Sequence, residues 1–357
     1  MLISLVHPVQ TASHSVFTTL QAGRFFAAMA VVGYHALLSI TAFVDIPSAF
    51  ATTVLKFGYL GVDFFFVLSG FVIHYSMSSA PRRISSFVYS RFTRIMLPYW
   101  PVGIGLGLAY LTMPHLAPQF TTSDSAWGWL STITLFPTGQ PPTLNVAWTL
   151  QHELLFYSLY TTLRFFDRVA AGLVLWTTAI ILFFVLDRPE MTFFQVLLAP
   201  INIEFVAGVL AAHVFMRGTR MKGIAYFGFA FTLILSFVLM GSNRHDSLLI
   251  GLAMATLLPW LCRQEMQGRF TVPNWLIFGG AASYAIYLVH NPLFSLSSRL
   301  MGAVGLDWMS ALVMSFCIAI GAGFLYYQVW EIPVMKLIGI KSHTQRAWGK
   351  GNTLPAK

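Results

Sequence analysis

Long apolar runs separated by short polar segments dominate the hydropathy pattern of this 357-residue chain. A helix needs about 20 apolar residues to cross the ~30 Å hydrocarbon layer of a membrane. Ten windows approach that length: 22–43, 57–78, 97–113, 146–163, 168–186, 191–214, 223–241, 246–262, 275–295 and 308–330. The pattern predicts an all-α fold, a polytopic integral membrane helix bundle of about ten transmembrane helices.

Composition supports a membrane protein and excludes a water-soluble one. The chain is 57% hydrophobic and 9% charged, with a mean hydropathy of +0.70, whereas soluble domains carry about 25% charged residues. A net charge of +9 can indicate nucleic-acid binding, but these basic residues cluster between apolar windows, where membrane orientation explains them. Cys262 and Cys317 are far apart in apolar sequence, so neither a disulfide framework nor a metal site is expected.

The basic residues also predict the orientation. Sixteen Lys and Arg residues follow the even-numbered windows and four follow the odd-numbered ones, which places both termini in the cytoplasm. We expect a short N-terminal segment at 1–19, a membrane domain at 20–340 and a disordered basic tail at 341–357 near anionic lipid. In the longest outer loop, an apolar piece at 127–136 is expected to lie in the membrane interface.

Arg24 and His35 share the first apolar window. On an ideal helix, eleven positions turn through about 1100° and rise about 16 Å, so both side chains lie on one face. A permanently charged guanidinium inside a membrane needs an anionic partner or ligand. This pair is therefore a functional candidate.

Other ionisable residues lie inside the windows. Counted from the predicted helix ends, Asp63, Glu153 and His290 come to a depth similar to that of His35 and can line one cavity with it. Structural roles remain open, because His74 and His290 are equally compatible with hydrogen-bonded packing, and Asp63 can simply hold a helix interface.

Two familiar catalytic motifs fail on inspection. His152 and Glu153 open like a zinc-protease signature, but Phe156 stands where its second histidine belongs. Ser69 lacks the flanking glycines of a nucleophile elbow. A histidine base, acidic neighbours and arginines instead suit group transfer from an anionic donor. A transporter or flippase for a glycan or small molecule is the alternative, and a sensor or scaffold without turnover is a third.

With these residues in view, the sequence resembles the acyltransferase-3 family of polytopic bacterial acyltransferases. The motifs that carry the resemblance are Arg24 with His35, GYLGVDFFFVLSGF at 58–71, FVYSRFTRIMLPYW at 87–100, WTLQHELLFY at 148–157 and ASYAIYLVHNPL at 282–293. Gln21 stands where the family's opening motif commonly has an aspartate. In this feature the sequence resembles the branch of the family that modifies exopolysaccharides.

The resemblance implies transfer of an acyl group, usually acetyl from acetyl-CoA, to a hydroxyl of a polysaccharide, lipid-linked glycan or small molecule. It implies His35 as catalytic base or transient acyl carrier, with Glu153 orienting His35 or the acceptor hydroxyl. Arg24 would position the donor, and Arg91 with Arg94 would contact its phosphates from the cytoplasm.

Further pocket candidates are Asp63, Ser69, His74, Ser283, Tyr284 and His290. The resemblance implies acyl-CoA as a donor substrate, no permanently bound cofactor, and no metal. It further implies a multi-pass protein of a bacterial inner membrane, where the lipid bilayer, the glycan acceptor and polysaccharide biosynthesis machinery are the expected partners.

Overall fold

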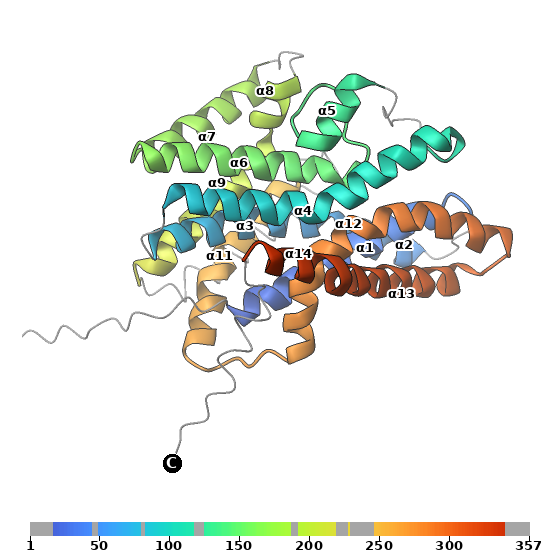
Figure 1. Ribbon diagram of the computed structural model, residues 1–357. Coiled ribbons are helices and arrows are strands. Elements are labelled where there is room, and N and C mark those ends of the chain that lie inside the picture. The colour runs from blue at the N-terminus through green and yellow to red at the C-terminus, as the bar shows by residue number, and fades with distance from the viewer. Residues whose placement is uncertain are drawn as a thin grey trace, which may run out of the picture.

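The computed structural model describes residues 17–44, 49–79, 83–117, 125–186, 192–218 and 246–339, together with Gly228. Within these ranges the chain forms helices and loops, without strands. The α-helices are α1 (Thr18–Ile40), α2 (Ala49–Lys56), α3 (Gly61–Ser78), α4 (Ile84–Thr112), α5 (Ala126–Thr134), α6 (Trp148–Phe165), α7 (Val169–Val185), α8 (Thr192–Leu197), α9 (Ile203–Met216), α11 (Asp246–Met266), α12 (Asn274–Ala303), α13 (Trp308–Tyr326) and α14 (Ile332–Leu337). Figure 1 shows α4, α6 and α7 lying side by side.

Shorter turns join several of these helices. They are the 3₁₀ turns η1 (Phe57–Leu60), η2 (Pro114–Leu116), η3 (Asn145–Ala147) and η4 (Pro200–Asn202), and the π-helical turn η5 (Tyr327–Glu331). Five segments are long and apolar enough to cross a membrane, namely Thr18–Ile40, Thr53–Ser78, Ile84–Thr112, Ser247–Met266 and Trp308–Leu337. The total number of spans and the side on which the termini lie remain predictions.

Two predicted windows differ from the observed helices. α4 begins at Ile84 rather than near 97, so most of the segment that connects the second and third windows is helical. The window 191–214 is interrupted between α8 and α9, because Pro200 cannot donate a backbone hydrogen bond and favours a new helical start. The window 223–241, the first 16 residues and the tail from 340 lie outside the described residues, apart from Gly228.

Glycines allow the central helices to approach each other closely. A Cβ atom on Gly280 of α12 would overlap with the carbonyl oxygen of Gln21 in α1, and one on Gly208 of α9 would overlap with the carbonyl of Val67 in α3. Small residues are the usual means of such packing in membranes. The helices α1 and α12 therefore form a tight pair, as do α3 and α9.

A proline within α4 leaves a backbone carbonyl free to accept a bond from a neighbouring segment. Pro101 has no N–H to donate to the carbonyl of Leu97, and the indole Nε1 of Trp330 donates to that oxygen instead, at 3.1 Å. Two residues earlier, the hydroxyl of Tyr284 donates to the carbonyl of Ile95 at 2.8 Å. These bonds fasten the middle of α4 to α12 and to η5.

The start of α1 is capped from a distant helix. The Glu265 carboxylate, near the end of α11, accepts hydrogen bonds from the backbone N–H and the hydroxyl of Thr18, at 2.6 and 2.7 Å. It accepts the same two bonds from Thr19, at 2.9 and 2.5 Å. A carboxylate at a helix N-terminus satisfies free N–H groups and suits the helix dipole. Glu265 thereby anchors the helix that carries Arg24 and His35.

Candidate active site

A cavity lies among α1, α3, α4, α6 and α12, with an empty volume of about 880 Å³ when the space open to solvent is included. Its polar wall consists of Arg24, Arg91, Arg94, Glu153, Tyr157, Ser69, Thr149, Ser283, Tyr284 and Tyr287, and the rest of its lining is apolar. Seven of the predicted site residues therefore surround one space: Arg24, Arg91, Arg94, Glu153, Ser69, Ser283 and Tyr284.

Arg24 reaches the cavity from α1 and is held by α12. Its Nε donates to the hydroxyl oxygen of Ser283 at 3.2 Å, and that hydroxyl donates to the carbonyl of Gly280 at 2.8 Å. The guanidinium also lies in the electrostatic field of the Glu153 carboxylate and of Glu331. Arg24 thus lies near the anionic groups that a guanidinium inside a membrane needs. Its direct hydrogen-bond partner is the Ser283 hydroxyl rather than a carboxylate.

Arg91 and Arg94 enter the cavity from α4. The hydropathy pattern puts both residues in the segment that connects the second and third windows, but α4 already includes them. Three positions apart, they lie on neighbouring parts of one helix face. The Arg91 guanidinium stacks 5.2 Å from the ring centre of Phe87, and Arg94 lies in the field of Arg24. We call Arg24, Arg91 and Arg94 the arginine wall.

Glu153 faces the arginine wall from α6. Its Oε1 accepts hydrogen bonds from the Ser69 hydroxyl at 3.0 Å and from the Tyr157 hydroxyl. The predicted contact with His35 is not among its bonds. Since α6 and α3 together fix this carboxylate against the cavity, its position suits contact with a bound substrate.

His35 and His290 lie next to each other, outside the cavity lining. The Nε2 atom of His290 is 3.1 Å from Nδ1 of His35. His290 is fully buried, and its ring packs 5.7 Å from the ring of Tyr287, measured between centroids. Tyr287 lines the cavity, so the imidazole pair is one side chain removed from it.

Asp63 and His74 do not share the cavity, and helix geometry explains why. On α3 each residue turns about 100°, so Asp63 and His74 point away from the direction of Ser69. Asp63 is buried and lies near Glu204 and Ser247, side chains of α9 and α11.

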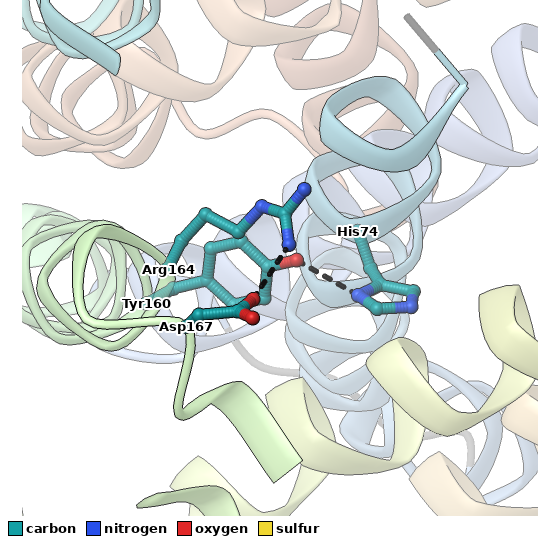
Figure 2. A network of polar contacts seen from close by, with 4 residues as sticks. All are labelled: His74, Tyr160, Arg164 and Asp167. Carbon is teal, nitrogen blue, oxygen red and sulfur yellow. Dashed lines mark hydrogen bonds and ion pairs between the residues drawn. The ribbon is translucent and has the colours of Figure 1, made fainter. Parts of the chain in front are cut away.

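His74 faces the far part of α6, as Figure 2 shows. Its Nδ1 is 2.8 Å from the hydroxyl of Tyr160. On the next turn of α6, Arg164 pairs with Asp167 at 3.4 Å. Four residues were predicted to line one cavity: His35, Asp63, Glu153 and His290. Of these, only Glu153 lines the cavity described here.

Sequence reasoning missed three cavity hydroxyls and one buried acid. Tyr157, Thr149 and Tyr287 line the cavity. Uncharged tyrosine and threonine are common in membrane helices, so residue type alone did not mark them as site residues. The spacing of Tyr157, one helical turn after Glu153, was the available signal. Glu331 was missed because it falls one position beyond the last apolar window.

Comparison with known proteins identifies the chain. The acyltransferase domain family matches residues 17–328, nearly the whole described chain. The chain belongs to this family. Family membership makes it an acyltransferase and argues against the transporter, flippase, sensor and scaffold alternatives.

Two curated relatives are similar over most of their length. "Exopolysaccharide production protein ExoZ" of Rhizobium meliloti (strain 1021) is 26% identical over 296 residues, covering 78% of this chain and 90% of the relative. "Acyltransferase MdmB" of Streptomyces mycarofaciens is 25% identical over 364 residues, covering 88% of this chain and 91% of the relative. No solved structure matches the chain.

Proposed function

We propose that this protein transfers an acyl group, usually acetyl, from a coenzyme A thioester to a hydroxyl of a glycan. The observation that carries the proposal is the convergence of three guanidiniums, from two helices, on one cavity that Glu153 also lines. Apolar helices and the acyltransferase family support a multi-pass membrane enzyme. We place it in a bacterial inner membrane.

The arginine wall is suited to the phosphates of coenzyme A. Arginine binds phosphate oxygens with two parallel N–H groups and keeps its charge in an apolar setting. Coenzyme A carries a diphosphate and a further phosphate, so three guanidiniums match its charge. We assign Arg91 and Arg94 to the phosphates and Arg24 to positioning the donor.

We assign the reactive end of such a donor to the vicinity of His35. α1 is continuous from Arg24 to His35, so their axial separation is about 16 Å. The pantetheine arm of coenzyme A is a long chain that separates the phosphates from the thioester. A donor held by the arginine wall therefore directs its acyl group along α1 toward Tyr287 and the imidazole pair.

The hydrogen bonds around His35 favour one tautomer. Its Nδ1 is 3.1 Å from the carbonyl of Val31, which only accepts, so Nδ1 carries the proton. His290 likewise donates from Nδ1 to the carbonyl of Ile286 at 3.2 Å, which leaves its Nε2 as an acceptor toward His35. The remaining nitrogen of His35, Nε2, then bears the lone pair of a base.

The proposed reaction follows from this tautomer. Nε2 of His35 takes the proton of the acceptor hydroxyl, and the hydroxyl oxygen bonds to the thioester carbonyl carbon. The carbon–sulfur bond breaks, and the leaving thiolate takes the proton from His35. Glu153, fixed by Ser69 and Tyr157, accepts a hydrogen bond from substrate inside the cavity.

The acceptor class rests on a relative. One similar protein is named for exopolysaccharide production, and from this we infer a polysaccharide or lipid-linked glycan acceptor, met beside the polysaccharide biosynthesis machinery.

The test uses purified full-length protein in detergent with radiolabelled acetyl-CoA and polysaccharide extracted from the host. We expect label on the glycan, released by mild alkali as an ester would be. A panel of longer acyl-CoA thioesters identifies the acyl group. Absence of transfer from every thioester, with folded protein, would contradict the proposal.

A further inference from the structure

The last long apolar helix ends in an irregular turn that carries a buried acid. α13 passes at Tyr327–Glu331 into the π-helical turn η5, which continues into α14. Such turns within helices frequently mark functional sites. Glu331 is 4% exposed, and an ionisable side chain within an apolar span is costly unless it serves a role.

Two members of the arginine wall act on Glu331. Its carboxylate lies in the electrostatic field of Arg94 and Arg24. One oxygen, Oε2, is buried without a hydrogen-bond partner among the described residues. Between residues that the structure describes, only Arg164 and Asp167 form an ion pair within 4.0 Å, so Glu331 has no ion-pair partner at that distance. Within this described part of the chain, Glu331 therefore acts on Arg94 and Arg24 through its charge without forming an ion pair with either.

Hydrogen bonds hold Glu331 in this position. Trp330, the preceding residue, donates to the carbonyl of Leu97 at 3.1 Å, and the hydroxyl of Tyr326 donates to the carbonyl of Pro98 at 2.6 Å. Both acceptors lie within one turn of Arg94 on α4. The turn that carries Glu331 and the helix segment that carries Arg94 are thus fastened together.

We propose that Glu331 is the internal counter-anion of the arginine wall: it stabilises Arg24 and Arg94 in the empty cavity and opposes the binding of an anionic donor. The inference rests on the proposed function for the identity of that donor. Three guanidiniums near one another repel in a medium of low dielectric constant, and a fixed carboxylate offsets part of that repulsion. When donor phosphates enter, they supply this charge themselves, and the carboxylate then repels them. Glu331 is therefore a positioning residue. By weakening donor binding, its charge makes the donor easier to release.

The test is Glu331→Gln, which keeps the shape and removes the charge. Binding of coenzyme A and of inorganic pyrophosphate is measured by calorimetry on purified full-length protein in mildly alkaline buffer. Thermal unfolding is followed with and without each ligand. We expect Kd for both ligands to fall by about three- to thirtyfold, the range for one unit charge about 8–25 Å from the phosphates at an effective dielectric constant near 20. We also expect the melting temperature of the empty protein to fall and either ligand to restore it.

The matched control is Glu265→Gln, which neutralises the carboxylate that caps α1 outside the cavity. It should lower the melting temperature while leaving both Kd values unchanged. This separates a charge effect on the cavity from general destabilisation. An unchanged or higher Kd in Glu331→Gln would overturn the proposal.

Two further outcomes keep the inferences separate. If the wild type binds pyrophosphate but not coenzyme A, the proposed donor is wrong, and the pyrophosphate Kd of Glu331→Gln still decides the role of Glu331. If the wild type binds neither, both are overturned. If Glu331→Gln does not fold, the double variant Arg94→Gln/Glu331→Gln should fold, because it restores the balance of charge. Failure of both variants to fold would contradict a counter-anion role.

Discussion

The Nδ1 atom of His35 lies 3.1 Å from Nε2 of His290, its neighbour on α12. Because His290 already donates its own proton to the carbonyl of Ile286, it can only accept from His35. The pair therefore orients the His35 ring and leaves its other nitrogen free to act as a base. Sequence reasoning found both histidines but did not show that they touch.

This relationship predicts different effects for two substitutions of His290. His290→Gln keeps an acceptor near Nδ1 of His35, so we expect kcat within about threefold of wild type. His290→Leu removes the side-chain acceptor and leaves the Val31 carbonyl as the other partner of Nδ1. It should lower kcat by about ten- to a hundredfold through loss of ring orientation, while the KM for acetyl-CoA stays the same. Steady-state kinetics with both variants is the measurement. Equal losses in the two variants would indicate a packing role.

The arginine wall predicts a specific loss of donor affinity. Hydrogen bonds to charged groups contribute about 1.5–3 kcal/mol, so Arg94→Gln should raise the Kd for coenzyme A by about ten- to a hundredfold. Arg164→Gln is the control, because it removes a half-exposed arginine outside the cavity lining. Calorimetry measures both. Similar affinities in the two variants would remove Arg94 from the donor site.

The position of Glu153 depends on its two hydrogen-bond donors. Tyr157→Phe removes one of them and keeps the ring, so we expect a fall in kcat of about three- to tenfold, with a larger fall for Glu153→Gln. Tyr160→Phe, one turn further along α6 and bonded to His74, is the matched control and should leave kcat unchanged. Initial rates of acyl transfer are the readout. A Tyr157→Phe variant as active as the control would show that this bond does not serve the reaction.

The cap on α1 predicts a loss of stability rather than of chemistry. Glu265→Ala leaves the N–H groups of Thr18 and Thr19 without their acceptor and should cost about 1–2 kcal/mol, the usual value of a lost cap. The melting temperature in detergent reports the change, and coenzyme A affinity should stay at the wild-type level. Unchanged thermal stability would mean that solvent replaces the carboxylate.

Much of the helical framework could be predicted from apolar runs alone. The windows at 57–78, 146–163 and 168–186 correspond closely to η1 with α3, to α6 and to α7. The start of α4 was missed because Arg91 and Arg94 interrupt the hydropathy that marks a membrane helix. Their side chains face the cavity rather than lipid, so the helix tolerates them.

The site could be predicted by residue type but not by arrangement. Arg24 and His35 share a stripe on α1, and their partners Ser283 and His290 both lie on α12. Which other acids join them depends on how α3 and α6 are rotated. That rotation places Glu153 in the cavity and turns Asp63 toward Glu204, and it follows from packing between distant helices rather than from any local pattern.

The most direct test of the account is a single-turnover experiment on His35→Ala with radiolabelled acetyl-CoA and the glycan acceptor, at a donor concentration that saturates the wild type. Coenzyme A affinity and melting temperature are measured on the same preparation. We predict normal donor binding with acyl transfer slowed by about 100- to 10,000-fold. Transfer at the wild-type rate by His35→Ala would contradict the account.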